Sequence, residues 1–476
     1  MIKLWRNSTV SGRPRALVRA GVVSLGVLVA TVSTVGVAAG LWPSAPAPQA
    51  SAAPLGALVS WSTGFQVQNL SNTTANVRVL YYDEQGNQVG DQRQPISPLS
   101  SFTFFGATMA APETFYGSIV IESDQDVAAI SNELTGNPTM LDSFAANPTP
   151  ARTSYLALVM RNNGGYSTEL FIQNAGTADA TDVKAEFYRR GETAPVDTIM
   201  VPALKPGGSY RIDQVAQERL GGSFVGSVRL TASQPVAAVV NQSNGNVLLS
   251  YGGVDRGSPR IFAPLVQAQN SGWETGLQVQ NVGGTAQNVT LTVRDGSGRV
   301  VRTEQATIGA NSSQTWFPIF IGARLIGSAT IEGSPDAQLV GIVNQVNFGS
   351  GQGTTYTTFA SGTPRAFAPL LMTNNSGFST GLQAQNVGTA PTNVTITVKD
   401  LGGNVVGQET ATVAAGSSKT WFPIPGTTIP GDRFVGSATI DGGAGSQIVA
   451  IVNTITDPQS DGDTSSSYVT INTAGP

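Results

Sequence analysis

The side chains of this chain that could take part in chemistry are aromatic rings, amides and carboxylates, because its 476 residues include no cysteine and no histidine. That composition excludes thiol nucleophiles, disulfides, Ser-His-Asp triads and histidine-based zinc or iron sites. Most familiar enzyme mechanisms need one of these groups. The sequence therefore predicts a protein that is not an enzyme and that has no cofactor built on cysteine or histidine.

Four aromatic residues recur at matching places, and each opens a segment that ends in asparagine, as from Trp61 to Asn69. Exposed rings at these places would form stacking platforms, which makes them the candidate ligand-binding residues. Alternatively, each ring packs over the edge of its own core, a normal place for a large ring with a polar handle. The position also accepts phenylalanine, which has no such handle, and this favours packing. The four residues are Trp61, Tyr166, Trp273 and Phe378.

Three carboxylates crowd one polar loop near the carboxyl end and form the candidate metal site, which would bind calcium. They are Asp457, Asp461 and Asp463. Carboxylates are ligands of this hard cation, but the spacing lacks the twelve-residue loop and terminal glutamate of an EF-hand. Calcium is the one cofactor that the sequence raises, and no other is expected.

Repeated asparagines could also be cation ligands, but amides alone supply too little charge. The alternative is that their side chains cap turns by binding loop backbone. The closing asparagines of the first motif are Asn69, Asn174, Asn281 and Asn386.

Paired carboxylates could catalyse glycoside hydrolysis without histidine. Glu122, Glu332 and Asp441 occupy comparable places at strand ends, but the second copy has Thr231 there. Since these acids do not recur in every copy, we interpret them as solvated residues at the rim of the sheets.

The elements that position these side chains form a fourfold repeat. The four closing asparagines are 105, 107 and 105 residues apart, a period as long as a domain and too long for a solenoid unit. A second motif begins with Gly-Ser and ends in asparagine. A third, Ser312–Pro318, recurs at Ser417–Pro423, and we expect its tryptophans Trp316 and Trp421 to lie in the core. The second motif covers Gly117–Asn132, Gly226–Asn241, Gly327–Asn344 and Gly436–Asn453.

Within each copy, short alternating runs predict β-strands. Val289, Leu291 and Val293 alternate with polar residues, as a strand with one buried face requires, and the turn that follows has the pattern Asp-x-x-Gly of a hairpin. Seven or eight such strands in about 100 residues are typical of an immunoglobulin-like β-sandwich. We expect an all-β chain of four tandem sandwiches joined in a stiff row. The expected bounds are 55–152 for repeat 1, 153–260 for repeat 2, 261–365 for repeat 3 and 366–476 for repeat 4.

Residues 1–54 have the features of an export segment. Five basic residues between Lys3 and Arg19 precede the uncharged, mostly apolar run Ala20–Trp42, and Ala50-Ser51-Ala52 resembles a cleavage site. The apolar run is longer than usual for a signal peptide and could also span a bilayer. Cleavage after Ala52 and retention as a membrane anchor are both open, and in either case the repeats are expected outside the cytoplasm.

The remaining chain has 21 basic and 30 acidic residues and no cluster of lysine or arginine, which argues against nucleic acid as a partner. In its repeat motifs and expected strands, the segment 55–476 resembles bacterial secreted or cell-surface proteins built of tandem immunoglobulin-like domains. This resemblance implies a structural, adhesive or glycan-contacting role. We expect a non-enzymatic modular spacer or binding array, with cell-surface glycan or other surface proteins as partners and membrane contact only through the amino-terminal segment. The alternative is a carbohydrate-binding or carbohydrate-active secreted protein.

Overall fold

The computed structural model describes residues 2–6, 17–23, 61–112, 115–136, 139–147, 149–427, 433–456 and 462–473. These residues form mainly antiparallel sheets, with one parallel pairing between β1 and β7, connected by turns and by the short 3₁₀ helices η2 (Gly106–Thr108) and η3 (Glu218–Leu220). In the described part of the chain no helix is long and apolar enough to cross a membrane. The predicted all-β class is confirmed.

Repeat 3 shows the architecture most clearly, because its strands form two separate four-stranded sheets. The outer sheet has the order β17-β22-β19-β20, and the inner sheet has the order β21-β18-β23-β24. The outer strands are β17 (Arg260–Ala268), β22 (Leu325–Glu332), β19 (Gln287–Asp295) and β20 (Val300–Ile308). The inner strands are β21 (Ser313–Trp316), β18 (Trp273–Asn281), β23 (Leu339–Asn347) and β24 (Gln352–Thr357).

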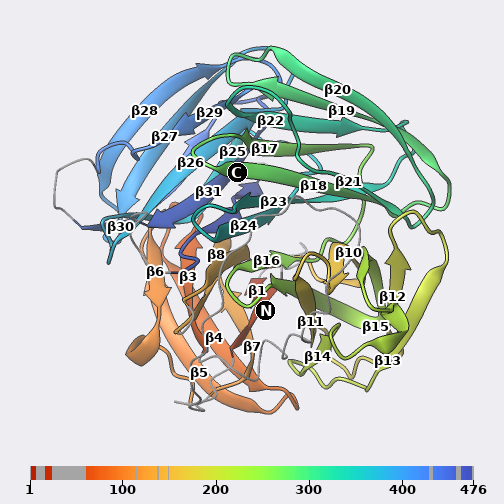
Figure 1. Cartoon of the computed structure of the whole chain (residues 1–476). Coiled ribbons are helices and arrows are strands. Elements are labelled where there is room, and N and C mark those ends of the chain that lie inside the picture. The colour runs from red at the N-terminus through yellow and green to blue at the C-terminus, as the bar shows by residue number, and fades with distance from the viewer. Residues whose placement is uncertain are drawn as a thin grey trace.

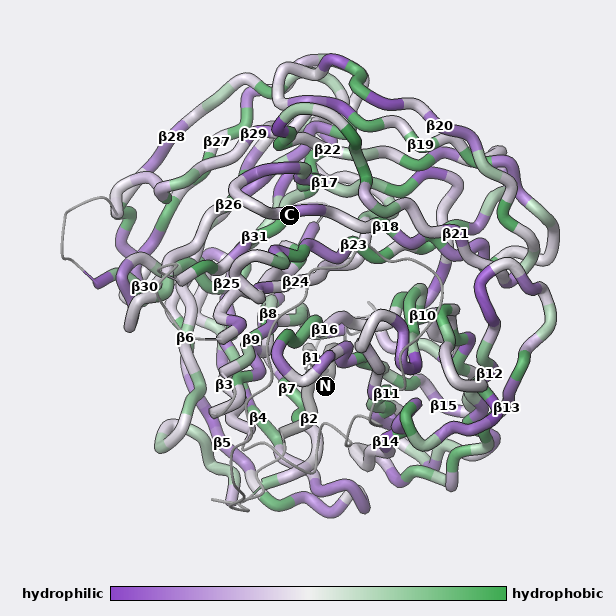
Figure 2. The backbone as a smooth tube through the Cα atoms, viewed as in Figure 1, coloured by the Kyte–Doolittle hydropathy of each residue, from purple (hydrophilic) through white to green (hydrophobic). Residues whose placement is uncertain are grey.

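The core of repeat 3 lies between these two sheets. Val289, Leu291 and Val293, the residues predicted to face inward, are at most 1% exposed, and they share one apolar cluster with Leu277 and Trp316. Figure 2 shows hydrophobic and hydrophilic positions alternating along the strands. The period-two pattern therefore predicted the strand and its buried face correctly.

Repeat 4 repeats this plan, with a fifth strand in its outer sheet. The outer order is β28-β27-β30-β25-β33, and the inner order is β29-β26-β31-β32. The outer strands are β25 (Arg365–Thr373), β27 (Thr392–Asp400), β28 (Val405–Val413), β30 (Phe434–Asp441) and β33 (Ile471–Thr473). The inner strands are β26 (Phe378–Asn386), β29 (Ser418–Trp421), β31 (Ile448–Thr456) and β32 (Ser466–Val469).

Repeat 2 differs because one long strand, β15 (Phe224–Ser243), takes part in both layers and joins them into a single seven-stranded sheet. Its first half pairs with β10 and β12, and its second half pairs with β11 and β16. The other strands are β10 (Ala151–Arg161), β11 (Ser167–Asn174), β12 (Val183–Arg189), β13 (Pro195–Val201), β14 (Ser209–Asp213) and β16 (Leu248–Gly252).

Repeat 1 has the inner order β6-β3-β8-β9 and the outer order β1-β2-β7-β4-β5. The inner strands are β3 (Trp61–Asn69), β6 (Ser101–Phe104), β8 (Val127–Thr135) and β9 (Leu141–Ala145). The outer strands are β1 (Ile2–Arg6), β2 (Leu17–Val23), β4 (Ala75–Asp83), β5 (Gln88–Ile96) and β7 (Gly117–Ser123).

Strand β2 occupies the place beside β7 that the first strand of the repeat takes in repeats 2, 3 and 4. It runs antiparallel to β7, with a register shift between Ala20 and Val23, and β17 shows the same shift between Ala263 and Val266. The predicted export segment thus contributes two strands to repeat 1. Its predicted cleavage site at Ala52 lies outside the described residues.

The predicted row of repeats is wrong, because the chain closes into a ring, with repeat 4 against repeat 1 (Figure 1). At each junction a hairpin turn of one repeat packs on the loop before the short inner strand of the next. The contacts are Ser209 N–H to the Glu84 carbonyl at 3.0 Å, Gly191 N–H to Ser312 Oγ at 3.0 Å, Gly298 beside Ser417, and Gly403 beside Ser100.

These turns are the predicted Asp-x-x-Gly hairpins in repeats 1, 3 and 4. Gly86, Gly298 and Gly403 have φ values of 81°, 90° and 87°, which glycine adopts without the steric penalty of a side chain. The turn chemistry read from the sequence therefore also builds the ring, because the same turns make its junctions.

Candidate functional site on the inner sheets

The centre of the ring is lined by one edge strand from each repeat. β9 contacts β16, β16 contacts β24, β24 contacts β32, and β32 contacts β9. An edge strand leaves backbone N–H and C=O groups without a sheet partner, so these four strands need other hydrogen-bond partners at the ring axis.

Asp142 of β9 supplies such a partner at the axis. Its Oδ2 accepts a hydrogen bond from Ser250 N–H at 2.5 Å, and its Oδ1 accepts from Ser467 N–H and from Thr354 Oγ1, both at 3.1 Å. One carboxyl group thus binds the axial segments of the other three repeats. The side chain is fully buried, and this burial raises its pKa well above the usual range.

Asp463 occupies a second axial position, reached from the loop before β32. Its carboxyl oxygens accept hydrogen bonds from Leu248 N–H and Gly353 N–H at 3.0 Å each, and its own N–H donates to the Thr139 carbonyl at 2.8 Å. Burial raises its pKa to about 7. It too contacts all three other repeats.

Asp463 is also one of the three predicted calcium ligands, but Asp457 and Asp461 lie outside the described residues. Among the described residues no group of three or more aspartate or glutamate side chains is placed to hold a metal ion. The hydrogen bonds of the Asp463 carboxyl oxygens go to protein groups, as its role at the ring junctions requires.

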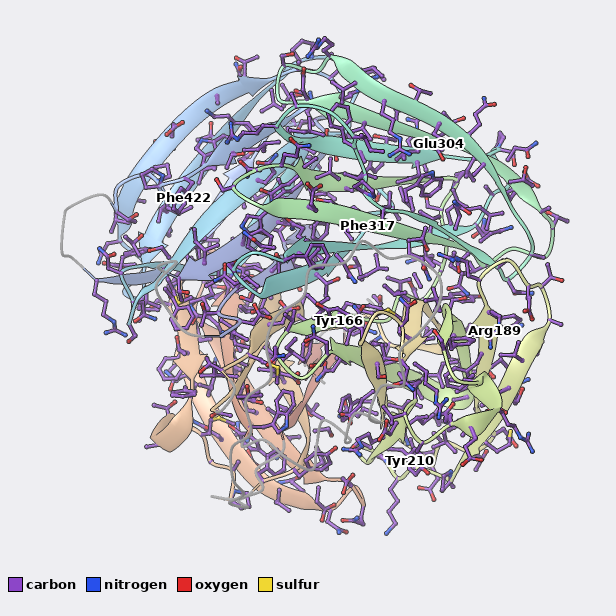
Figure 3. All side chains as sticks on the ribbon, viewed as in Figure 1. Tyr166, Arg189, Tyr210, Glu304, Phe317 and Phe422 are labelled. Carbon is purple, nitrogen blue, oxygen red and sulfur yellow. The ribbon has the colours of Figure 1, made fainter. Side chains whose placement is uncertain are left out.

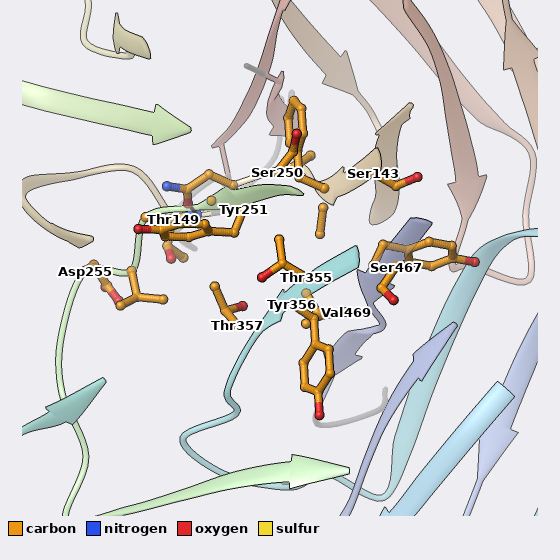
Figure 4. A pocket seen from close by; sticks show the side chains of 18 residues that line it. Ser143, Thr149, Ser250, Tyr251, Asp255, Thr355, Tyr356, Thr357, Ser467 and Val469 are labelled. Carbon is orange, nitrogen blue, oxygen red and sulfur yellow. Dashed lines mark hydrogen bonds between the residues drawn. The ribbon is translucent and has the colours of Figure 1, made fainter. Parts of the chain in front are cut away.

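A pocket of about 180 Å³ lies on the axis, and all four edge strands line it (Figure 4). Ser143, Thr355 and Ser467 are lining residues from three repeats, and each donates its hydroxyl to a neighbouring asparagine: Asn132 at 2.6 Å, Asn344 at 2.7 Å and Asn453 at 2.7 Å. The wall of the pocket is thus already engaged in hydrogen bonds within the protein.

The four candidate stacking residues are not equally accessible. Trp61 and Tyr166 are buried, Trp61 against Met140 and Leu248 and Tyr166 in the core of repeat 2. Burial raises the pKa of Tyr166 above its ordinary value. Trp273 and Phe378 are half-buried, and Phe378 packs against the core of repeat 4.

The closing asparagines of the first motif cap turns, as the alternative interpretation predicted. Asn281 Nδ2 donates to the carbonyls of Thr285 and Ile308 at 2.7 and 3.1 Å, and its Oδ1 accepts from Gly283 N–H at 3.0 Å. Asn69, Asn174 and Asn386 make the equivalent bonds in the other repeats. These amides hold backbone in place.

The carboxylates that we interpreted as solvated rim residues are partly exposed, and they form ion pairs. Glu122, Glu332 and Asp441 pair with Arg78, Arg260 and Arg365 at 3.2, 2.5 and 2.7 Å. Each pair joins two neighbouring strands of an outer sheet and is partly exposed, so each contributes little to stability.

A different set of residues forms a repeated feature on the face of the inner sheets that lies opposite the core, the face that packs on the neighbouring repeat further along the strands. Each repeat has one such row, which crosses the inner sheet from the short strand at its outer edge to the edge strand at the ring axis. In repeat 3 the row is Phe317, Gly276, Asn344 and Thr355, in which Gly276 lies opposite Asn344 and Asn344 lies opposite Thr355. Repeat 1 has Phe105, Gly64, Asn132 and Ser143, and repeat 4 has Phe422, Gly381, Asn453 and Ser467.

The glycine in each row allows the phenylalanine ring to lie over the strand. A Cβ atom added to Gly64, Gly276 or Gly381 would stand 3.0, 3.1 or 3.4 Å from a ring carbon of its phenylalanine. An aromatic ring that covers a glycine on the next strand is a known way to stabilise a sheet. Phe105 and Phe422 are nevertheless 54% and 55% exposed, and Figure 3 labels Phe317 and Phe422 on their sheets.

Repeat 2 has a charged row at the equivalent place. Glu169 replaces the glycine and lies opposite Asp213, which replaces the phenylalanine, and Arg211 stands 3.5 Å from Glu169. On the other side Glu169 lies opposite Asn241, whose Nδ2 donates to Glu133 of repeat 1 at 2.7 Å. Burial raises the pKa of Glu133 to about 7.

Sequence reasoning missed the cross-strand rows. One signal of the rows was present in the sequence, since Phe317 and Phe422 belong to the recurring Ser-Ser-x-Thr-Trp-Phe-Pro motif. From the sequence we interpreted only the tryptophan of that motif. The tryptophans Trp316 and Trp421 are each 2% exposed, as predicted. Strand alternation sends the next residue to the opposite face, so a buried tryptophan implies an outward phenylalanine.

No family model and no curated protein matches this chain. Among solved structures, allantoicase from Saccharomyces cerevisiae is 11% identical over 60% of this chain and 73% of its own, with a TM-score of 0.14. A putative β-galactosidase from Bacteroides fragilis is 11% identical over 50% of this chain and 32% of its own, with a TM-score of 0.12. Likenesses at this level carry no argument about the fold or the function.

Proposed function

We propose that this protein is a non-enzymatic extracellular structural or adhesion protein, in which four immunoglobulin-like β-sandwich domains form one binding array. The proposed domains have the bounds 55–152, 153–260, 261–365 and 366–476. The paired sheets of repeats 1, 3 and 4, each enclosing an apolar core, support four such units, and the outer sheet of repeat 1 also includes β1 and β2 from the residues before 55.

The observation that carries the proposal is the closure of the ring by Asp142 and Asp463. Each carboxyl binds segments of repeats that are distant in the sequence, so all four repeats are held in one fixed arrangement. A fixed arrangement presents the same face of every repeat in the same direction, because rotation about the ring axis keeps that face on one side. This suits a platform that meets an extended surface.

The carboxylates support a role without catalysis. Asp142 and Asp463 are engaged by backbone N–H groups, and the rim acids are engaged by arginines. A general acid or nucleophile must instead reach a substrate. In this proposal the protein needs no cofactor.

The extracellular location rests on the amino-terminal sequence. The basic residues before the apolar run Ala20–Trp42 support export, either with cleavage after Ala52 or with retention as an anchor. Since β1 and β2 lie in the outer sheet of repeat 1, cleavage after Ala52 would remove two strands of that sheet. The proposed partners are glycans or proteins of the cell surface. The excess of acidic residues in the remaining chain disfavours nucleic acid.

Fractionation of producing cells tests this proposal. We expect the full chain across or outside the membrane and accessible to added protease, and a chain that starts at Pro54 in the cytosol. A full chain confined to the cytosol would overturn the extracellular role. The mass of the exported protein then distinguishes cleavage near Ala52 from a retained anchor.

One observation favours a second candidate, a carbohydrate-binding protein. In three of the four repeats a cross-strand row places a phenylalanine ring and an amide on either side of a glycine, and in repeats 1 and 4 the ring is more than half exposed.

A further inference from the structure

We propose that the rows of repeats 1, 3 and 4 are three saccharide subsites at corresponding positions, in which the phenylalanine stacks on a sugar ring and the asparagine binds its hydroxyl groups. This inference rests on the proposed extracellular role and names the ligand class of the binding array. Each subsite comprises the phenylalanine, glycine and asparagine of one row: Phe105, Gly64 and Asn132; Phe317, Gly276 and Asn344; Phe422, Gly381 and Asn453.

The phenylalanine ring of each row lies against the glycine of the neighbouring strand. In repeat 4, Cβ, Cγ and Cδ2 of Phe422 all lie 3.4 to 3.8 Å from the place where a Gly381 Cβ would stand. The Cβ–Cδ2 side of the ring is therefore held against the glycine strand, while Phe422 as a whole is 55% exposed. An exposed apolar ring can stack on the C–H face of a pyranose, and the contact with the glycine restricts the ring before binding.

A hydrogen bond from a neighbouring serine sets the orientation of the asparagine side-chain amide in repeats 1 and 4. Asn132 Oδ1 accepts the Ser143 hydroxyl at 2.6 Å, and Asn453 Oδ1 accepts the Ser467 hydroxyl at 2.7 Å. The oxygen is thereby occupied, and the Nδ2 group of each points away from that bond. Among the described residues no acceptor takes the Nδ2 hydrogens of Asn132 or Asn453, and both side chains are partly exposed. These donors are available to sugar hydroxyls.

The spacing between ring and amide suits a sugar. Neighbouring strands lie about 4.8 Å apart, so a phenylalanine and an asparagine that flank a glycine strand stand roughly 10 Å apart at their backbones. The ring leans over the glycine and closes part of this gap. A sugar ring on the phenylalanine then has its edge above the glycine, where its hydroxyls face the amide.

Repeat 3 carries an additional ring and a different amide environment. Phe348 is 63% exposed and makes an edge-to-face contact with Phe317, with 6.3 Å between ring centres. Asn344 Nδ2 donates to Gln242 of repeat 2 at 3.0 Å, so this subsite offers more aromatic surface and fewer free donors. We therefore expect all three subsites to bind saccharide, with repeat 3 depending most on stacking.

Repeat 2 provides an internal negative control for saccharide binding. Its row has no ring, because Asp213 stands in the phenylalanine position and Glu169 stands in the glycine position. Its asparagine, Asn241, already donates to Glu133 at 2.7 Å. We expect no saccharide at this row.

Calorimetric titration of the exported, purified chain with short soluble oligosaccharides tests the proposal. The panel is cellotriose, laminaritriose and chitotriose. At least one should bind, with three sites per chain. Phe422→Ala should leave two sites of unchanged affinity and weaken the third roughly two- to tenfold. The variant Phe105→Ala/Phe317→Ala/Phe422→Ala should lose most of the binding.

Three further variants separate binding from folding. Phe422→Tyr keeps the ring and should restore the third site, and Asn453→Asp keeps the oxygen that Ser467 binds but removes the donors, so it should weaken that site. Tyr210→Ala removes a ring that is 36% exposed on β14 of repeat 2, outside every subsite, and should leave the number of saccharide sites and their affinities unchanged. Far-ultraviolet circular dichroism should show the same fold for each variant.

Three outcomes would overturn the inference. They are no binding by any member of the panel, unchanged binding by the triple variant, and a stoichiometry unaffected by Phe422→Ala. Loss of cell adhesion in the triple variant without saccharide binding would instead point to a protein partner. Since cell fractionation tests the extracellular role separately, a failure of the saccharide subsites leaves that role standing.

Discussion

Asp142 Oδ1 accepts a hydrogen bond from the backbone N–H of Ser467 at 3.1 Å, although the two residues are 325 positions apart in the chain. Asp142 belongs to repeat 1 and Ser467 to repeat 4, so this bond joins the two ends of the repeat series. The same carboxyl binds Ser250 N–H and Thr354 Oγ1. A single side chain therefore contacts every repeat at the axis.

Replacing Asp142 should destabilise the whole ring. Asp142→Ala leaves the buried N–H groups of Ser250 and Ser467 without their acceptor, and each such group costs about 1 to 3 kcal/mol. We expect the free energy of unfolding in urea to fall by about 2 to 6 kcal/mol. Asp179→Ala, at an exposed position, should stay within about 0.5 kcal/mol of the native protein. An Asp142→Ala chain as stable as this control would contradict the role of Asp142.

The stability of the ring should fall as pH rises through neutrality. Burial raises the pKa values of Asp463 and Glu133 to about 7 and raises that of Asp142 as well. These carboxyls hold protons more tightly in the folded than in the unfolded chain. Their contribution to stability is thus complete below about pH 4 and is lost as pH rises through about 7.

Thermal melts between pH 5 and pH 8 check this expectation. The melting temperature should decrease across this range, and Asp463→Asn should flatten the decrease, because an amide does not titrate there. The carboxyls with lowered pKa values, such as Asp91 and Asp400, lose their contribution only at more acidic pH and do not interfere. A melting temperature that rises from pH 5 to pH 8 would show that the charged forms are the stable ones.

Truncation of Trp421 should cost much more unfolding free energy than truncation of Phe422, although the two residues are neighbours. Trp421 is 2% exposed in the core of repeat 4, so Trp421→Ala should cost about 3 to 5 kcal/mol of unfolding free energy. Phe422 faces outward, so Phe422→Ala should cost less than about 1 kcal/mol. Chemical denaturation of both variants makes the comparison, and equal costs would place both rings in the core.

Repeat 4 alone, residues 366–476, should unfold cooperatively but at a lower temperature than the intact chain. Its core cluster is formed almost entirely by its own residues, which supports independent folding. Isolation removes the partners of Asp463 in repeats 2 and 3. Calorimetry should show one transition, and a fragment without any transition would mean that the repeats fold only within the ring.

Local patterns in the sequence determined the strands, the turns and the cores. The alternation at Val289 and Leu291 predicted a buried strand face, and the Asp-x-x-Gly pattern predicted the hairpins, because both depend on residues within one or two strands of each other. The asparagine caps followed for the same reason, since Asn281 binds backbone nearby in the same repeat. The resemblance between copies then predicted four similar units.

Only the tertiary structure decided how those units are arranged and which side chains meet. The expected row of repeats is instead a ring, because the hairpin turn of each repeat packs on a loop of the next repeat and repeat 4 contacts repeat 1. The axial role of Asp142 depends on partners in three other repeats, and the pairing of Phe317 with Gly276 and Asn344 depends on the register of three strands. Neither is visible in local spacing, because a register and a junction angle are set by packing over the whole molecule.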